Sequence, residues 1–125
     1  FHFNVELLKG PCLYKRLTGC GAGYEYLAVT PTGELYPCHQ FVGLKDFLLG
    51  DVWRGITNQE LPLKFKDAHV LNSPVCKSCW AKYFCSGGCK KSNREYAGDF
   101  LGVDEFSCEL AKKRLECSFY IQAHF

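Results

Sequence analysis

The sequence predicts a small α+β domain in which a β-hairpin, loops and a C-terminal helix surround cysteine-ligated metal. Four cysteines crowd into the stretch from Cys76 to Cys89, which indicates a metal site. A strand, turn and strand pattern spans residues 24–36, and residues 104–122 contain neither glycine nor proline. The first pattern is typical of a hairpin and the second of a long helix.

Composition and charge limit which classes of protein this chain can belong to. The 125 residues are 47% hydrophobic and 22% charged, which is typical of one globular domain and disfavours disorder. A net charge of +2, from interspersed basic and acidic residues, is too weak to indicate nucleic-acid binding. No segment approaches the ~20 continuous apolar residues of a membrane helix. Because the chain begins at Phe1 and contains no methionine, we expect it to be part of a longer protein.

The predicted hairpin brings two cysteines together. Residues 24–30 are rich in β-branched and aromatic side chains, residues 31–33 form a Pro-Thr-Gly turn, and residues 34–36 continue as the second strand. Cys20 precedes the first strand and Cys38 follows the second. Since the two ends of a hairpin lie side by side, Cys20 and Cys38 could share one metal site.

The segment from residue 41 to residue 72 contains no cysteine. Residues 49–51, Leu-Gly-Asp, are typical of a turn, and residues 62–68 predict a short helix. Leucine, phenylalanine and valine dominate the segment, so we expect it to supply core and scaffold.

The C-terminal helix should begin after Asp104, a residue type that caps helix N-termini. We expect one buried helix face, which carries Cys108, Ala111, Leu115 and Phe119. Near the helix start, Cys108 lies where the helix dipole favours a thiolate. Cys117 is about half a turn out of phase and ~13 Å farther along, so we leave it out of the site and expect a small buried side chain.

The cysteine-rich loop has Cys-x2-Cys-x5-Cys-x3-Cys spacing, with two glycines that allow tight bends before its last cysteine and aromatic neighbours that would exclude water. Iron-sulfur clusters and zinc both fit this spacing. The odd total of nine cysteines disfavours a fully disulfide-bonded framework, and free structural thiols are the remaining alternative. His39 follows Cys38 directly, but we expect it to be structural rather than a ligand. A site of this kind forms in a reducing, cytoplasmic environment.

Seven cysteines resemble the signature of the SPASM domain of radical S-adenosylmethionine enzymes. Twelve residues separate Cys20 from Gly33, four more separate Gly33 from Cys38, and the four-cysteine loop and Cys108 complete the pattern. The resemblance covers nearly the whole chain, so residues 1–125 are expected to form one such domain. Four strings further resemble the SCIFF peptide maturases, which form thioether cross-links in a cysteine-rich ribosomal peptide: GPCLYKRLTGCG, EYLAVTP, LYPCHQFVG and CSGGC.

The resemblance implies two 4Fe-4S clusters with interleaved ligands. Auxiliary cluster II would be held by Cys76, Cys79, Cys85 and Cys108. Auxiliary cluster I would be held by Cys20, Cys38 and Cys89, with Cys12 as a fourth ligand. Related SPASM enzymes use an additional upstream cysteine in this way, and the alternative is an open iron that a substrate thiolate completes.

The resemblance also implies what this chain lacks. The chain contains no Cys-x3-Cys-x2-Cys motif, which binds S-adenosylmethionine and a third 4Fe-4S cluster in a preceding core domain, so it would be inactive alone. The implied partners are that radical core domain and a cysteine-rich ribosomal precursor peptide. The auxiliary clusters would bind a substrate thiolate or accept the electron left after sulfur-carbon bond formation. Two alternatives remain, a structural zinc-binding domain and a free-standing electron-transfer module.

Overall fold

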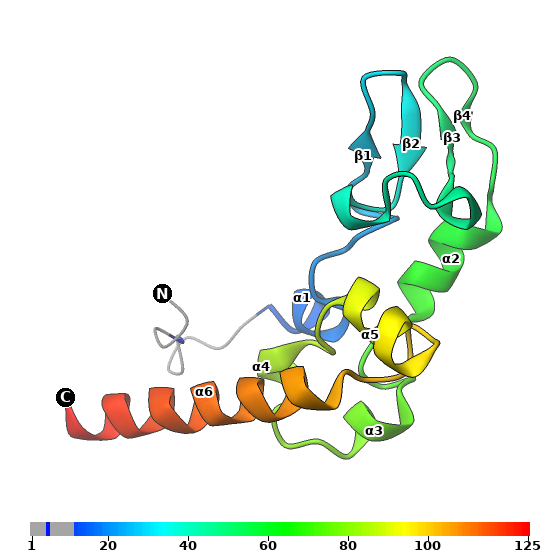
Figure 1. Ribbon diagram of the computed structural model, residues 1–125. Coiled ribbons are helices and arrows are strands. Elements are labelled where there is room, and N and C mark those ends of the chain that lie inside the picture. Colours follow the sequence, from blue (N-terminus) through cyan, green and yellow to red (C-terminus); the bar gives the residue numbers. More distant parts are fainter. Residues whose placement is uncertain (1–4, 6–11) are drawn as a thin grey trace. The chain divides into compact units, whose positions relative to one another are not determined.

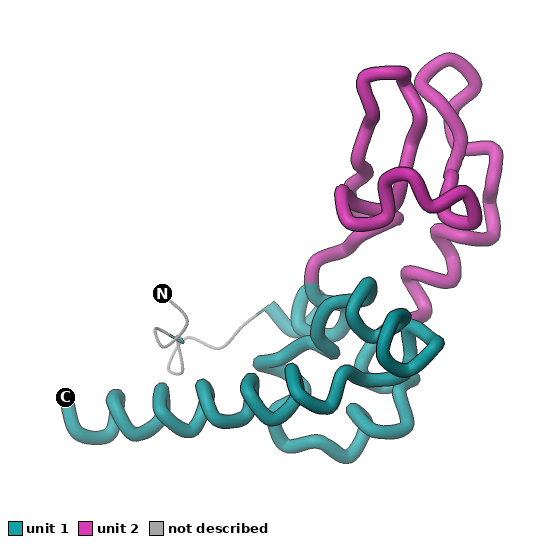
Figure 2. The backbone as a smooth tube through the Cα atoms, viewed as in Figure 1, with its two compact units in different colours: residues 1–19, 69–125 teal, residues 20–68 magenta. Residues whose placement is uncertain are grey.

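The computed structural model describes residue 5 and residues 12–125, which form helices and a small antiparallel sheet (Figure 1). The predicted α+β class is confirmed. The chain divides into two compact units (Figure 2): unit 1 comprises residues 1–19 and 69–125, and unit 2 comprises residues 20–68.

Unit 2 is built on a four-stranded antiparallel sheet with strand order β1-β2-β3-β4: Ala28–Val29, Glu34–Tyr36, Gly50–Asp51 and Gly55–Ile56. The predicted hairpin is confirmed, since Val29 pairs with Leu35 across β1 and β2. Its first strand is shorter than predicted. The chain turns before β1, where the Gly23 N–H donates to the carbonyl oxygens of Tyr26 and Pro37.

The prediction of a turn at residues 49–51 was wrong. Gly50 and Asp51 form β3, which pairs with β4 in a second hairpin. A Cβ at Gly50 would lie 2.0 Å from the Gly55 carbonyl oxygen, so glycine permits close strand approach rather than a turn. The turn follows β3, where the Asp51 carboxylate accepts backbone N–H groups from Trp53 and Arg54 at 3.1 and 2.8 Å.

Two short 3-10 helices and one α-helix complete unit 2: η1 at His39–Phe41, η2 at Lys45–Phe47 and α2 at Glu60–Asp67. The helix predicted at residues 62–68 is therefore confirmed, with a start two residues earlier. The Phe41 and Phe65 rings meet edge to face at 5.4 Å, and both side chains are buried, as is Leu49. This segment supplies core, as the sequence predicts.

Unit 1 is helical in its described part. Its helices are α1 Leu13–Thr18, α3 Pro74–Lys77, α4 Lys82–Cys85, α5 Lys90–Ala97 and α6 Glu105–His124. Helix α4 packs against both α1 and α6. Phe119 of α6 contacts the rings of Trp80 and Phe84 at centroid distances of 6.1 and 5.8 Å. Val70, Ala81 and Leu115 are buried in this unit.

The C-terminal helix is confirmed, together with its N-cap. Asp104 accepts the Ser107 backbone N–H at 3.3 Å and the Ser107 hydroxyl at 2.6 Å. Of the face predicted to be buried, Leu115 is buried and the other three residues are half-buried. Cys117 is exposed, so the expectation of a buried thiol was wrong. It lies on the solvent side because Leu115 and Ser118 occupy the packed face.

Within residues 12–125, no helix is both long enough and apolar enough to cross a bilayer.

Candidate metal centre

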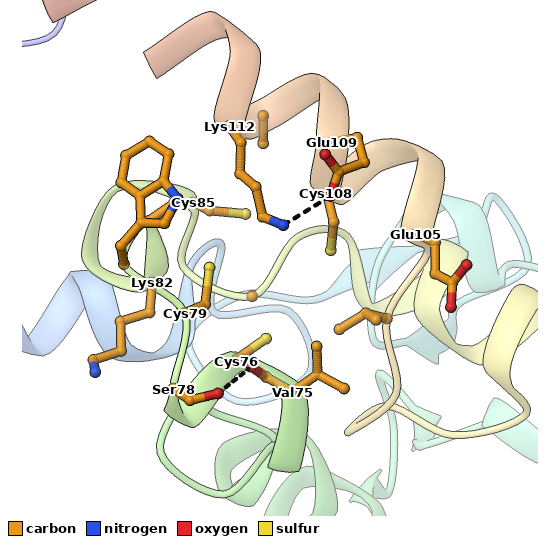
Figure 3. A pocket seen from close by; sticks show the side chains of 15 residues that line it. Val75, Cys76, Ser78, Cys79, Lys82, Cys85, Glu105, Cys108, Glu109 and Lys112 are labelled. Carbon is orange, nitrogen blue, oxygen red and sulfur yellow. Dashed lines mark hydrogen bonds and ion pairs between the residues drawn. The ribbon is translucent and has the colours of Figure 1, made fainter. Parts of the chain in front are cut away.

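Four cysteines of unit 1 line one cavity of about 530 Å³. Cys76 comes from α3, Cys79 from the loop after it, Cys85 from the end of α4 and Cys108 from the first turns of α6. Their sulfur atoms face one another across the cavity (Figure 3). The structure therefore brings together all four residues that the resemblance assigns to cluster II.

Short local interactions place the first two sulfurs. Ser73 caps α3, since its hydroxyl oxygen accepts the Cys76 backbone N–H at 3.4 Å. The same hydroxyl donates to the Leu101 carbonyl oxygen at 2.6 Å, which ties α3 to the segment before α6. A turn then brings the Cys79 N–H to the Cys76 carbonyl oxygen at 3.0 Å. Both thiols of the Cys-x2-Cys pair are thus directed to one side of the chain.

Asn93 of α5 connects the cysteine loop to the start of α6. Its side-chain amide donates to the Gly87 carbonyl oxygen at 2.8 Å. Its side-chain oxygen accepts the Asp104 backbone N–H at 3.3 Å. Because Asn93 is buried, these bonds compete little with water and fix the loop after Cys85 relative to the helix that carries Cys108.

Two of the four thiols show the electrostatic effect of sharing a cavity. Burial raises the pKa of the Cys85 thiol, and the neighbouring Cys76 and Cys79 raise it further. Hydrogen bonds donated by the backbone N–H groups of Gly87 and Gly88 oppose this increase. Burial also raises the pKa of Cys108, again with contributions from the other cavity cysteines. A positive metal centre is the natural partner that would stabilise four thiolates here.

The spacing of the donors bears on which metal centre they fit. Four thiolates on one tetrahedral ion with ~2.3 Å bonds would lie about 3.8 Å apart. Among the residues that the structure describes, no three His, Cys, Asp or Glu side chains are grouped as a single ion requires. The four sulfurs line one shared cavity, and their chemistry suits both zinc and an iron-sulfur cluster.

Two of the cysteines assigned to cluster I meet within unit 2. Cys20 and Cys38 both lie close enough to the Tyr26 hydroxyl to act on its pKa. Burial, followed by the charges of these two cysteines, raises the pKa of Tyr26 to about 12. Tyr26 therefore remains a neutral donor at physiological pH. Cys38 is buried, Cys20 is exposed, and the hairpin brings them to one hydroxyl as the sequence predicts.

The other two cysteines assigned to cluster I belong to unit 1. Cys89 is exposed at the N-cap position of α5, and Cys12 is exposed at the N-cap position of α1. Cys12 lines a smaller cavity of about 450 Å³ with Lys15, Arg16, Gly19, Cys85 and Ser86. Since Cys20 and Cys38 lie in unit 2, the grouping of all four into cluster I stays a prediction. His39 is exposed, in η1.

Sequence reasoning missed three residues that contact or line these sites, namely Tyr26, Asn93 and Lys112. Lys112 lies four residues after Cys108, so helical spacing alone places both on one face of α6. The interactions of Tyr26 and Asn93 depend on tertiary packing, and no local pattern indicates them.

We expect Asn93→Leu to destabilise the protein by about 2–3 kcal/mol, because it leaves the half-buried Gly87 carbonyl and the buried Asp104 N–H without their partner. Thermal denaturation followed by circular dichroism measures this loss as a fall in Tm of about 10 °C. Tyr96→Ala is the matched control, since Tyr96 is exposed on the same helix. Equal Tm values for the two variants would show that Asn93 does not join the loop to α6.

Comparisons with known proteins agree with this site. Residues 20–80 match the family model of SPASM, an iron-sulfur cluster-binding domain. The PqqA peptide cyclase of Methylobacterium sp. (strain 4-46) is 27% identical over 106 residues, which are 78% of this chain and 27% of that protein. The protein AlbA of Bacillus subtilis (strain 168), for biosynthesis of the antilisterial bacteriocin subtilosin, is 32% identical over 68 residues, 53% of this chain and 12% of AlbA.

A second PqqA peptide cyclase, that of Methylorubrum extorquens (strain ATCC 14718 / DSM 1338 / JCM 2805 / NCIMB 9133 / AM1), is 26% identical over 106 residues, which are 78% of this chain and 26% of that protein. The chain thus spans about a quarter of the length of the PqqA peptide cyclases that it matches. The matched family region contains Cys20, Cys38, Cys76 and Cys79. The wider boundary of residues 1–125 for one domain stays a prediction. The resemblance inferred from the cysteine spacing is confirmed over residues 20–80, which match the SPASM iron-sulfur cluster-binding domain.

Proposed function

We propose that this chain is the auxiliary cluster domain of a radical S-adenosylmethionine enzyme that modifies a ribosomally made peptide. The observation that carries this proposal is the convergence of four cysteine sulfurs on one cavity. The similar proteins support the substrate class, because one group is named for cyclising the PqqA peptide and AlbA for making the bacteriocin subtilosin.

In this proposal, Cys76, Cys79, Cys85 and Cys108 hold auxiliary cluster II as a 4Fe-4S cluster. Such a cluster supplies one-electron storage close to the substrate. The Gly87 and Gly88 N–H groups stabilise the Cys85 thiolate, and Trp80 and Ala81 line the cavity wall. Hydrogen bonds to sulfur and exclusion of water both tune the reduction potential of such a centre.

Auxiliary cluster I is assigned to Cys20, Cys38 and Cys89, with Cys12 as its fourth ligand. The effect of both Cys20 and Cys38 on the pKa of Tyr26 supports the pairing of these two cysteines. Because Tyr26 stays protonated, it would donate to the thiolates and stabilise their charge. Cys12 and a substrate thiolate are alternatives for the fourth ligand position.

The reaction that we propose for the longer enzyme is thioether formation between a cysteine sulfur and a carbon of a cysteine-rich precursor peptide. The four strings shared with SCIFF maturases support this choice. The preceding core domain would bind S-adenosylmethionine and the third 4Fe-4S cluster. This chain would bind and orient the peptide and take up an electron, and it would not start the reaction alone.

Metal analysis tests the cluster assignment. After anaerobic reconstitution the chain should hold about eight irons and a similar amount of acid-labile sulfide, as two 4Fe-4S clusters require. Stoichiometric zinc without sulfide would instead identify a structural zinc domain.

A second experiment tests the proposed reaction. The longer enzyme is incubated with its peptide, and the mass of the peptide and the number of its thiols that can be alkylated are measured. Loss of two hydrogen atoms and of one free thiol per cross-link is expected, whereas an unchanged peptide indicates an electron carrier.

A further inference from the structure

Lys112 of α6 extends into the cavity of the four cysteines. It lies one helical turn after Cys108, lines the same cavity, and its side chain is only 33% exposed. Figure 3 shows its nitrogen pointing in among the sulfur atoms, whereas the nitrogen of Lys82 points away from them. A buried or half-buried charge so placed acts on the cavity with less screening by water than a surface charge.

Glu109 holds this ammonium group in place. Its carboxylate forms an ion pair with the Lys112 nitrogen at 2.7 Å. The hydrogen bond and charge of Glu109 raise the pKa of Lys112, and the nearby Cys79 and Cys108 raise it further. Lys112 is therefore cationic throughout the physiological range. Glu109 is 74% exposed, so water screens its charge more than it screens that of Lys112.

The sign of the electrostatic effect follows from the charges. A 4Fe-4S centre with four thiolate ligands carries net negative charge, and uptake of one electron makes it more negative. A nearby cation stabilises the reduced form more than the oxidised form, so it raises the reduction potential. Glu105 and Glu109 at the cavity oppose this effect, but both side chains are exposed.

We propose that Lys112 raises the reduction potential of auxiliary cluster II by holding its ammonium group beside the sulfurs of Cys79 and Cys108. This inference rests on the proposed function, since it assumes a 4Fe-4S cluster in this cavity. The step it governs is the transfer of one electron from a low-potential donor into the cluster, with no change in the protonation of Lys112. The residue acts on the cluster through space, by its charge alone.

The test is a potentiometric titration of the full-length reconstituted enzyme, in which electron paramagnetic resonance follows each reduced cluster. Lys112→Gln should lower the reduced-to-oxidised ratio of cluster II between about threefold and tenfold at a fixed potential, where tenfold equals about 59 mV for one electron. Lys112→Arg keeps the charge and should restore the wild-type ratio. Cluster I should not shift in either variant.

Lys113→Gln is the matched control. Lys113 is the adjacent lysine of α6 and forms an ion pair of the same spacing with Glu116, but its side chain is 71% exposed. It should leave both potentials unchanged. An equal shift of the cluster II potential in Lys112→Gln and Lys113→Gln would overturn the proposal. The effect would then come from the net charge of the protein and not from the position of Lys112 in the cavity.

Lys112→Met keeps the apolar stem and serves as a second neutral variant. An unchanged cluster II potential in both neutral variants, with full iron content, would overturn the proposal. So would loss of iron from both, because the ammonium group would then serve assembly rather than potential. Failure of the proposed function is distinguishable, since the wild-type protein would then lack a 4Fe-4S signal before any lysine is replaced.

Discussion

Removing iron and sulfide should unfold much of unit 1 and lower its thermal stability by 10 °C or more, equivalent to about 3 kcal/mol. The four cavity cysteines come from α3, the following loop, α4 and α6, so the metal would cross-link four separate segments of the chain. Metal-ligand free energy in such a domain is also folding free energy. Far-ultraviolet circular dichroism and a thermal melt of the apo protein measure the loss.

Unit 2 should lose less structure than unit 1 in this experiment, although it contains Cys20 and Cys38. Its buried side chains include Phe41, Leu49 and Phe65, and the Phe41 and Phe65 rings pack directly against each other. Amide hydrogen exchange should therefore remain slow at Leu49, whose N–H is bonded to the Leu35 carbonyl at 2.8 Å, while exchange along α6 accelerates. A cooperative melt at the holo temperature, with α6 still protected, would contradict a folding role for the clusters.

The sequence alone was sufficient to predict those elements whose ends are set by residues a few positions away. The glycine turn at residue 33 and the cap at Asp104 each act within a few residues, so the first hairpin and the long helix were predictable. The second hairpin was not, because Gly50 has the composition of a turn but serves the close approach of Gly55. A short strand of this kind depends on its partner rather than on its own propensity.

Some features of the candidate site could likewise be predicted from the sequence, and others could not. Spacing in the loop indicates a shared metal site, whereas the choice of Cys108 rather than Cys89 as the fourth thiol came from the family resemblance. The groups that hold those thiols come from distant segments: Ser73 bonds to Leu101, and Asn93 bonds to Gly87 and Asp104. Such contacts exist only in the folded chain. Lys112 is intermediate, since helical periodicity places it beside Cys108 but does not show that it points inward.

Cys85→Ala and Cys89→Ala should damage different clusters, although only three residues separate the two cysteines. Cys85 faces the cavity and accepts N–H groups from Gly87 and Gly88. Cys89 follows both glycines, occupies the N-cap position of α5 and is not among the residues that line the cavity. Both glycines have positive φ, 82° and 70°, so the chain reverses between the two thiols.

Each variant should lose up to about four of the eight irons expected for this chain. Electron paramagnetic resonance of the reduced proteins identifies which signal disappears: cluster II in Cys85→Ala and cluster I in Cys89→Ala. Cys117→Ala is the control, because Cys117 is exposed and assigned to neither cluster, so both signals should remain. Loss of one and the same signal in both variants would place the four loop thiols on a single metal centre. The interleaved assignment would then be wrong, and Cys108 would need another role, because the loop alone would complete four ligands.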